Sequence, residues 1–206
     1  MNLSWQYKRL QMLAQGKGEL VLGSGNQSAQ IMLIGEAPGR EEVQAGRPFV
    51  GKAGRNLDSF LEATRLAREE LYLTNVVKFR PVRISPKGTA SNRPPTQQEI
   101  ALCTPYLKAE IEQVSPRLIL TLGNIALQAM LGREAKIGQY HGREALTAGG
   151  KTVFALYHPA SIIYNPKLKQ TYAEDLARLR AYLTKRDKSA SIEELKREAE
   201  EWNEKR

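Results

Sequence analysis

The sequence predicts an α/β protein, a three-layer α/β/α sandwich with a central, mainly parallel four-stranded sheet. Short apolar runs, each typical of a buried strand, are followed by stretches with apolar residues at helical spacing. Strands that alternate with helices favour parallel pairing and a sheet covered on both faces. A length of 206 residues is enough for one sizeable core and too short for two. The predicted strands are residues 31–34, 71–77, 118–122 and 152–156.

The helices are predicted from apolar residues that recur every three or four positions and from signals at the helix ends. Thr96, followed three residues later by Glu99, forms a capping box at the start of a long helix. Residues 79–95 before it are rich in Pro, Ser and Arg and are expected to form a loop, and residues 142–151 a hairpin. The predicted helices cover residues 2–14, 55–66, 97–114, 125–131 and 167–185.

The connection over residues 35–54, GEAPGREEVQAGRPFVGKAG, joins the first strand to the helix after it. A connection of this length in a compact domain is usually functional. Its five glycines and two prolines fix the backbone and let N–H groups approach a ligand closely. It also carries three acids, Glu36, Glu41 and Glu42, and one aromatic residue, Phe49. A surface loop with solvated charges is the alternative interpretation.

The net charge of +9 is unevenly distributed along the chain. Residues 185–206 carry seven basic and seven acidic side chains, so the excess belongs to residues 1–184. Residues 71–98 contain five Lys or Arg and no acid, and residues 145–173 contain three Lys and no acid. A basic face around a cleft is what binding of a phosphate backbone requires. A generally basic surface without a nucleic-acid partner is the alternative.

The single cysteine, Cys103, excludes an internal disulfide and fits a reducing compartment. The chain has no run of eighteen apolar residues and no charged-then-apolar leader. We therefore expect no membrane association and a cytoplasmic location, in a bacterial or archaeal cytosol.

Residues 35–54 closely resemble the first signature of the family 4 uracil-DNA glycosylases. Three further stretches agree with that family in order and spacing: TNVVK at 74–78, TLG at 121–123 and YHPA at 157–160. The resemblance runs from about residue 21 to about residue 183. It implies a base-excision repair enzyme that flips uracil out of DNA and hydrolyses its N-glycosidic bond, leaving an abasic site. Uracil-containing DNA is the implied partner, and neither a metal nor a nucleophilic lysine is needed.

The resemblance gives catalytic roles to three residues. The amide of Asn75 would read uracil at N3–H and O4, because it offers one acceptor beside one donor. His158 would donate to uracil O2, where negative charge gathers as the bond breaks. Glu36 would orient the attacking water. Since Ala37 stands where a related family has an aspartate, the identity of any general base stays open.

The resemblance also implies a pocket for the uracil ring. Phe49 would stack on the ring, and Glu42 would lie near C5, where it would collide with the methyl group of thymine. Backbone N–H groups around Ala37 and Gly39 would add donors. Outside these motifs, Phe49 would be read as a core residue and Asn75 as a turn former.

Contacts to DNA are expected from several places along the chain. Gly123 and Asn124 open a helix whose N-terminus could receive a phosphate. The two isoleucines that follow the His-Pro turn suit an apolar wedge for the base stack, although at least one of them is expected to plug the core. His141 lies outside the motifs and is expected to be a surface or loop residue. The predicted DNA-binding residues are Lys78, Arg80, Gly123, Asn124, Ser161, Ile162, Ile163 and Lys167.

Family 4 enzymes hold an iron–sulfur cluster with four cysteines, and this chain departs from that pattern. Phe79 stands at the third ligand position, and only Cys103 remains, at the fourth. One thiolate cannot hold a cluster that needs four ligands. We therefore expect no cluster and no other cofactor, with side-chain packing in place of the metal.

Two other functions remain as alternatives. A non-catalytic DNA-binding relative of the same fold would keep the basic cleft without turnover. A branch of the superfamily captures DNA covalently through a histidine in the loop before the long helix. Residues 79–95 contain no histidine, which disfavours that branch.

The resemblance does not cover residues 185–206, which we expect to follow a glycosylase-like domain over residues 1–184. Ser191 and Glu194 form a capping-box pattern, and apolar residues recur at helical steps from Ile192 to Trp202. This predicts a charged amphipathic helix over residues 191–205. It would dock on its own chain or on a protein partner, because a helix this short is marginal alone.

Overall fold

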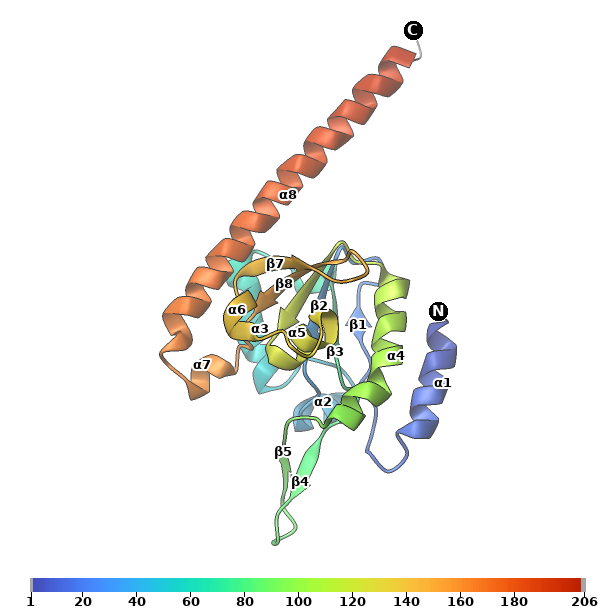
Figure 1. The fold of residues 1–206 in the computed structure, drawn as a ribbon, viewed down its shortest axis with the longest axis vertical. Coiled ribbons are helices and arrows are strands. Elements are labelled where there is room, and N and C mark those ends of the chain that lie inside the picture. The colour runs from blue at the N-terminus through green and yellow to red at the C-terminus, as the bar shows by residue number, and fades with distance from the viewer. Residues whose placement is uncertain (1, 205–206) are drawn as a thin grey trace.

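The computed structural model describes the backbone of residues 2–204. It also describes their side chains, except those of residues 52, 53, 56, 163, 164 and 187–204. A six-stranded sheet with the order β1-β3-β2-β6-β8-β7 forms its centre (Figure 1). Its four inner strands are parallel neighbours: β3 (Leu71–Asn75), β2 (Ile31–Gly35), β6 (Leu118–Leu122) and β8 (Thr152–Leu156). These are the four strands that the sequence predicts.

The prediction of a four-stranded sheet is wrong in its count, because each edge carries one more, antiparallel strand. β1 (Ser24–Gly25) pairs with β3, and β7 (Arg143–Leu146) pairs with β8. β1 has only two residues, and three of the four residues of β7 are exposed. Neither strand therefore shows the apolar run that marks the inner strands. β7 and β8 form the hairpin expected from the turn-rich residues 142–151.

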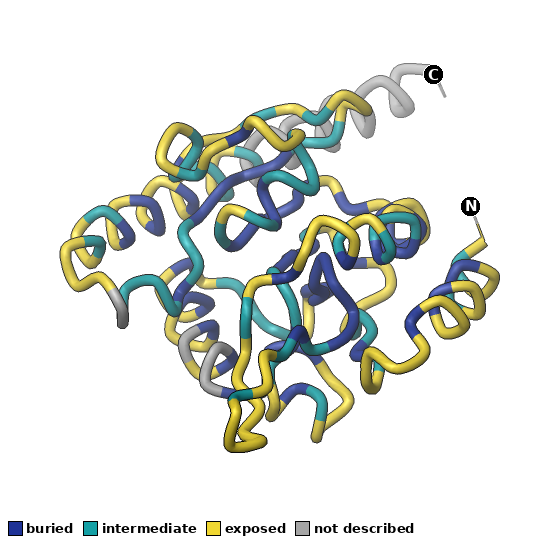
Figure 2. Tube along the Cα trace, turned by 60° about the horizontal axis from the view of Figure 1, so that its bottom comes forward, coloured by how far each residue is buried: buried dark blue, intermediate teal, exposed yellow. Residues whose placement is uncertain are grey.

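Helices cover both faces of the sheet, because successive side chains of each strand point to opposite faces. Met32 and Ile34 of β2 belong to one hydrophobic cluster, with α1 (Leu3–Leu13), α4 (Gln97–Val114) and α5 (Asn124–Leu131). Leu33 belongs to the other cluster, with α3 (Lys52–Thr64) and α8 (Leu168–Glu204). Figure 2 shows the sheet as the buried centre, with more exposed helices around it.

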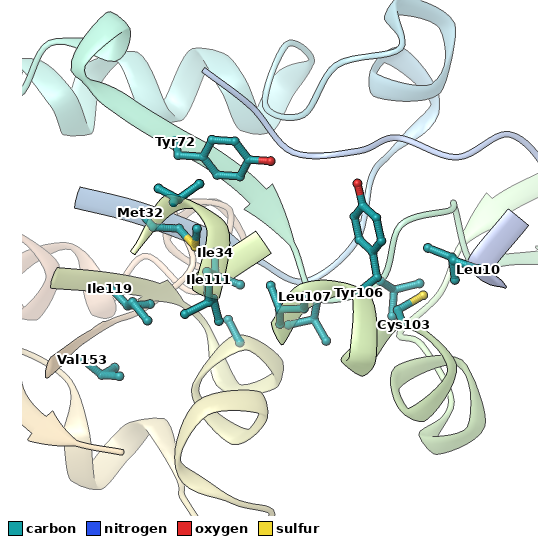
Figure 3. Close-up of a cluster of buried hydrophobic side chains, with 14 of the residues drawn as sticks. Leu10, Met32, Ile34, Tyr72, Cys103, Tyr106, Leu107, Ile111, Ile119 and Val153 are labelled. Carbon is teal, nitrogen blue, oxygen red and sulfur yellow. The ribbon is translucent and has the colours of Figure 1, made fainter. Parts of the chain in front are cut away.

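Apolar packing fills the region around Cys103, where the family pattern would place cluster ligands. Cys103 and Phe79 are buried in the same cluster as Leu10 and Ala14 of the N-terminal segment. Figure 3 shows Leu10, Tyr106 and Cys103 close together in this cluster. Burial raises the pKa of the Cys103 thiol, which keeps it protonated and makes it a poor metal ligand. This packing joins α1 to α4.

The remaining elements are short and lie in the connections. They are α2 (Arg40–Ala45), the 3₁₀ turn η1 (Arg68–Glu70), β4 (Val82–Ile84), β5 (Ala90–Asn92), α6 (Ile137–Tyr140) and α7 (Ser161–Tyr164). β4 and β5 pair into a hairpin that projects from the body (Figure 1), so the prediction of a loop at residues 79–95 missed two short strands. The polar composition of this segment hid the hairpin, since most of its residues are exposed on both faces.

The C-terminal helix is longer than expected. α8 runs without a break from Leu168 to Glu204, so no separate helix begins at Ser191. The predicted docking of residues 191–205 lies outside the side chains that the structure describes. Within the described part of the chain, no helix combines the length and apolar character needed to cross a membrane.

Candidate active site

A cavity of about 520 Å³ lies at the carboxyl ends of the parallel strands. Ligand groups of α/β folds gather at this edge, because the connections that leave the strands meet there. The walls come from four places: the segment after β2, the end of β3, the base of the β4–β5 hairpin and the turn after β8. The cavity contains Glu36, Ala37, Gly39, Glu42, Phe49, Asn75 and His158, so it collects every residue predicted to act on the base.

Asn75 and Phe49 meet beside Gly35, which makes room for both. Gly35 ends β2 and lies directly opposite Asn75 of β3. A Cβ atom at Gly35 would collide with Asn75 Oδ1 and lie 2.6 Å from Phe49 Cζ. Both side chains are buried, at 4 % exposure each. The motif glycine therefore lets a flat ring and an amide edge line one slot.

The backbone at Phe49 is held in an unusual conformation. Its φ of 56° is in the left-handed region, which a bulky L-residue rarely adopts. The carbonyl oxygen of Phe49 accepts a hydrogen bond from Arg68 Nη1 at 3.1 Å. Arg68 also donates to Asp58 Oδ1 at 2.8 Å, so α3 and the chain before β3 hold the turn in place. The strained backbone of Phe49 is therefore kept at the position where the Phe49 ring lines the cavity.

Glu42 connects two parts of the segment after β2. One carboxylate oxygen accepts from the N–H of Gly39 at 3.0 Å and the other from the N–H of Gly51 at 2.8 Å. The predicted donor at Gly39 is therefore already used by Glu42, which corrects the expectation that this N–H serves a ligand. Glu42 still lines the cavity with Ala37 and Gly39. It shapes the wall while it holds the loop closed.

Glu36 and His158 are cavity residues whose pKa values are shifted by burial. Burial raises the pKa of the Glu36 carboxyl above its ordinary value of 4.5. Burial lowers the pKa of the His158 imidazole below 6.5, so the ring is neutral at pH 7. Its Nδ1 accepts from the N–H of Ala160 at 3.1 Å, which leaves the proton on Nε2. His158 is thus a neutral N–H donor.

Lys78 corrects the sequence prediction, because its side chain is completely buried. Its Nζ donates to Thr74 Oγ1 and to the carbonyl oxygen of Asn75, each at 2.6 Å, and forms an ion pair with Glu110. A charge buried and paired in this way cannot reach a DNA phosphate. Lys78 instead holds the carboxyl end of β3, where Asn75 sits. The sequence around Lys78 contains no acid, and it does not show that Glu110, 32 residues away, is the partner of Lys78.

The other predicted DNA contacts lie at different positions around the cavity. Arg80 lines it and donates to Asn92 Oδ1 at 2.6 Å. Gly123 approaches His158 closely, and its N–H donates to the carbonyl oxygen of Leu156 at 2.8 Å. That bond takes one N–H at the start of α5, and the expectation that this helix N-terminus receives a phosphate stays a prediction. Asn124 is exposed, and its Oδ1 accepts from the N–H of Ile137 at 3.0 Å.

The turn after His158 forms α7, which contains the expected wedge. Ser161 is half-buried and donates its N–H to the carbonyl oxygen of His158 at 2.8 Å. Ile162 is half-buried and packs against the cluster that contains Phe49 and Leu156, so it serves the core rather than standing free. Ile163 lies outside the side chains that the structure describes. Lys167 is exposed after the end of α7.

His141 is not the simple surface residue expected from the sequence. Its Nδ1 lies 2.9 Å from Oδ2 of Asp175, a fully buried carboxylate of α8 that also pairs with Arg178 at 3.2 Å. The His141 ring packs against Tyr157, with 4.9 Å between ring centres. Through His141, these contacts join α8 to Tyr157, which follows β8 and directly precedes His158. No sequence motif indicates them, because His141 and Asp175 are 34 residues apart.

Two residues that the sequence reasoning missed belong to the cavity wall. Asn92 and Arg93 lie at the C-terminal end of β5, at the base of the β4–β5 hairpin, and line the cavity with Pro81 and Pro94. Arg93 donates to both oxygens of Glu99, at 2.7 and 2.8 Å. These bonds lower the pKa of Glu99 to about 2. The available signal was the basic, acid-free composition of residues 71–98.

A wider hollow of about 750 Å³ lies between α3 and α8. Its lining is mostly small and aliphatic, and it contains no residue of the four motifs. Among the side chains that the structure describes, no group of three or more His, Cys, Asp or Glu could hold a metal ion. The motif residues lie in the smaller cavity instead.

The smaller cavity combines an aromatic ring, an amide edge, a neutral imidazole donor and a partly buried carboxylate, with basic side chains at its rim. These residues line one cavity at the carboxyl ends of the parallel strands, where α/β folds hold their ligands. The chain belongs to the uracil DNA glycosylase superfamily, whose family model matches residues 22–180.

The comparisons with individual proteins agree with this family. The chain is 37 % identical to a type-4 uracil-DNA glycosylase of Archaeoglobus fulgidus, over 81 % of this chain and 83 % of that protein. It is 38 % identical to the type-4 enzyme of Saccharolobus solfataricus, over 80 % and 76 %. The crystal structure of Pedobacter heparinus SMUG2 shares the fold, with a TM-score of 0.53 at 14 % identity, over 78 % of this chain and 77 % of that one.

Proposed function

We infer that this protein is a monofunctional uracil-DNA glycosylase, which hydrolyses the N-glycosidic bond of uracil in DNA and leaves an abasic site. The observation that carries this function is that residues from three of the four motifs, those at 35–54, 74–78 and 157–160, meet in one cavity. The family match and the type-4 relatives support it. An enzyme of this kind needs a group that reads uracil, a ring that stacks on it and a donor that stabilises it as it leaves. Asn75, Phe49 and His158 supply these three.

Base recognition follows from the slot beside Gly35. Phe49 presents a ring on which an extrahelical pyrimidine stacks. Asn75 donates its amide N–H to uracil O4 and accepts N3–H at Oδ1. Cytosine has the opposite pattern at position 4, so it leaves donor facing donor. Glu42 and Phe49 close the wall, which leaves little room for the C5 methyl group of thymine.

The chemical step depends on charge that develops as the bond breaks. Negative charge gathers on uracil O2, and the Nε2–H of His158 stabilises it. A neutral imidazole suits this role, since the Ala160 N–H fixes its tautomer. Glu36 orients the water that attacks the sugar. Its ionised form is the active one, because a carboxylate accepts a proton from that water.

We propose that the enzyme works without an iron–sulfur cluster or other cofactor. The apolar packing of Leu10, Phe79 and Cys103 supports this, because it occupies the region that the ligands would share. Purified protein should lack the visible absorption of such clusters. Iron and sulfide at cluster stoichiometry in protein prepared without oxygen would overturn this proposal.

We also propose two units, a glycosylase domain over residues 1–184 and a charged helical extension over residues 185–206, in a protein that works in a prokaryotic cytosol. The extension continues α8 beyond the body (Figure 1). This course favours docking on a protein partner over docking on the body of its own chain. Truncation after Thr184 should lower stability or association and leave uracil release intact. A truncated protein that stays folded and monomeric but loses catalysis would contradict this division.

The function is tested by incubating the protein with oligonucleotides that carry one uracil, in a single strand and opposite A or G. Release of uracil, with strand breakage only after alkali, is the expected result. Asn75→Asp and His158→Ala serve as matched inactive variants. DNA binding without uracil release in any context would favour the alternative, a non-catalytic DNA-binding relative.

A further inference from the structure

The β4–β5 hairpin is the one cavity-wall element, in the part of the chain that the structure describes, that projects from the body (Figure 1). Both strands are largely exposed, and the hairpin is coloured accordingly in Figure 2. A two-stranded hairpin has little stability of its own, so its base must be fixed if its tip is to have a defined position.

The base of the hairpin is anchored at both ends. Arg93 donates to the carbonyl oxygen of Val82 at 3.0 Å and forms a two-point ion pair with Glu99 at the start of α4. Arg80 donates across the hairpin to Asn92. The two strands therefore leave the cavity rim as a supported arm, with their direction set by α4.

One face of this arm continues the cavity wall. Cross-strand partners share a face, so the pairs Val82–Asn92 and Ile84–Ala90 point to the same side. Asn92 lines the cavity, which places Ile84 on the same face further out. Ile84 is 60 % exposed. The other large exposed apolar side chains in the described part of the chain belong to α1 and to Leu146 at the far end of the sheet.

The charge of the arm is entirely positive. Arg80, Arg83, Lys87 and Arg93 are its charged residues, with no acid between residues 71 and 98. Arg83 and Lys87 are exposed, Arg83 on β4 and Lys87 in the turn between β4 and β5. Three strand residues at roughly 3.3 Å each carry the tip roughly 10 Å beyond the rim. DNA rises about 3.4 Å for each nucleotide of a strand, so the arm reaches roughly three nucleotides from the cavity.

We propose that the β4–β5 hairpin is a DNA-binding arm that contacts the duplex beside the flipped nucleotide, with Ile84 against the opened base stack and Arg83 and Lys87 at phosphates. This inference rests on the proposed function, since it names how that site holds its DNA. In this proposal Ile84 makes the apolar contact with the base stack, because Ile162 is packed against the hydrophobic core. An exposed apolar side chain beside basic ones fits a partner that offers base faces between phosphates.

The apolar contact is tested with Ile84→Ser, matched by Leu146→Ser on β7. Leu146 is 69 % exposed and pairs with the amino end of β8, opposite the cavity. Ile84→Ser should weaken binding to a duplex with a tetrahydrofuran abasic site about tenfold. It should slow single-turnover uracil release from duplex and leave release from single strands unchanged. Equal effects of the two substitutions, or equal loss on single strands, would overturn the contact.

The phosphate contacts are tested with the double variant Arg83→Ala/Lys87→Ala. Its control is Arg117→Ala/Lys151→Ala, which removes two cations next to the amino ends of β6 and β8. Binding to a uracil-free duplex is measured over a range of salt. The arm variant should lower the salt slope by about 1.8, since each phosphate contact contributes about 0.9. A slope equal to wild type, or an equal drop in the control, would overturn the proposal.

These binding experiments separate the arm from the function itself. Neither the uracil-free duplex nor the abasic duplex requires catalysis. If wild-type protein released no uracil, the proposed function would fail while the salt slope still reported on the arm. If uracil release were normal and both arm variants bound like their controls, the proposed DNA-binding arm would be wrong and the proposed function would be unaffected.

Discussion

The imidazole Nδ1 of His158 accepts a hydrogen bond from the backbone N–H of Ala160, at 3.1 Å. Together with the burial that lowers the pKa of His158, this bond fixes the ring as neutral with its proton on Nε2. Ala160, the last residue of the YHPA motif, therefore sets the tautomer of His158. The proposed donor to uracil O2 depends on this arrangement.

His158→Ala should reduce single-turnover uracil release on the order of 10²–10³-fold, the size expected when one donor to a developing oxyanion is lost. Binding of uracil-containing DNA, measured by fluorescence anisotropy, should stay near the wild-type value. A loss of affinity as large as the loss of rate would contradict a transition-state role.

Asn75→Asp should remove most of the uracil activity, because a carboxylate cannot offer the donor that faces uracil O4. Activity on cytosine is expected if the carboxyl accepts from the amino group of cytosine. Both are measured on single-stranded oligonucleotides, where no base pair must open. Wild-type uracil release by this variant would show that the base is read elsewhere.

Gly35→Ala should lower uracil release on the order of 10²-fold, because a displacement of about 1 Å near the chemistry can have that effect. The new methyl group would meet Asn75 Oδ1 and the Phe49 ring. Gly138→Ala is the matched control, since no atom lies within 4 Å of its Cβ position. A fully active, equally stable Gly35→Ala protein would mean that the slot is wider than the structure shows.

Lys78→Met should destabilise the fold by about 3–5 kcal/mol, because it leaves the buried carboxylate of Glu110 without its counter-charge. Urea unfolding measures this change. The contrasting variant is Arg80→Met at the cavity rim, which should keep its stability and bind DNA more weakly. The opposite result, normal stability and weak DNA binding for Lys78→Met, would restore Lys78 as a DNA contact.

The pH dependence of the reaction should follow Glu36. Since burial raises its pKa, the ionised form needed to orient water is lost at a higher pH than for an exposed glutamate. The acid limb of single-turnover uracil release should therefore lie above pH 4.5. Glu36→Gln should remove this limb and lower the plateau on the order of 10²-fold.

The raised pKa of Glu36 also makes the stability of the folded protein depend on pH, in a known direction. The folded protein holds the Glu36 proton more tightly than the unfolded chain does, so stability is lost as pH rises through the raised pKa. Glu36→Gln has no such loss and should gain stability relative to wild type as the pH rises above 4.5, the ordinary pKa of glutamate. Thermal melts at several pH values check this. A constant difference across that range would argue against a shifted Glu36.

Much of the fold follows from local sequence patterns. The four parallel strands were predictable because a strand buried on both faces must be a continuous apolar run. The start of α4 was predictable because Thr96 and Glu99 satisfy each other's backbone within one turn. The edge strand β1 and the β4–β5 hairpin were not predictable, because exposed strands carry no apolar pattern. The turn-rich residues 142–151 did indicate the hairpin that contains β7.

The sequence by itself also determined the family and the residues that line the cavity, since motifs of fixed spacing bring Glu36, Phe49, Asn75 and His158 to the carboxyl ends of parallel strands. Only the tertiary structure decided which polar groups are already engaged. Lys78 with Glu110, His141 with Asp175, and Glu42 with the N–H groups of Gly39 and Gly51 are such cases. A buried charge or amide takes whichever partner packing brings near, and two of these partnerships join residues more than thirty positions apart. Composition can mark a stretch as basic, but burial decides whether its charge meets DNA or another side chain.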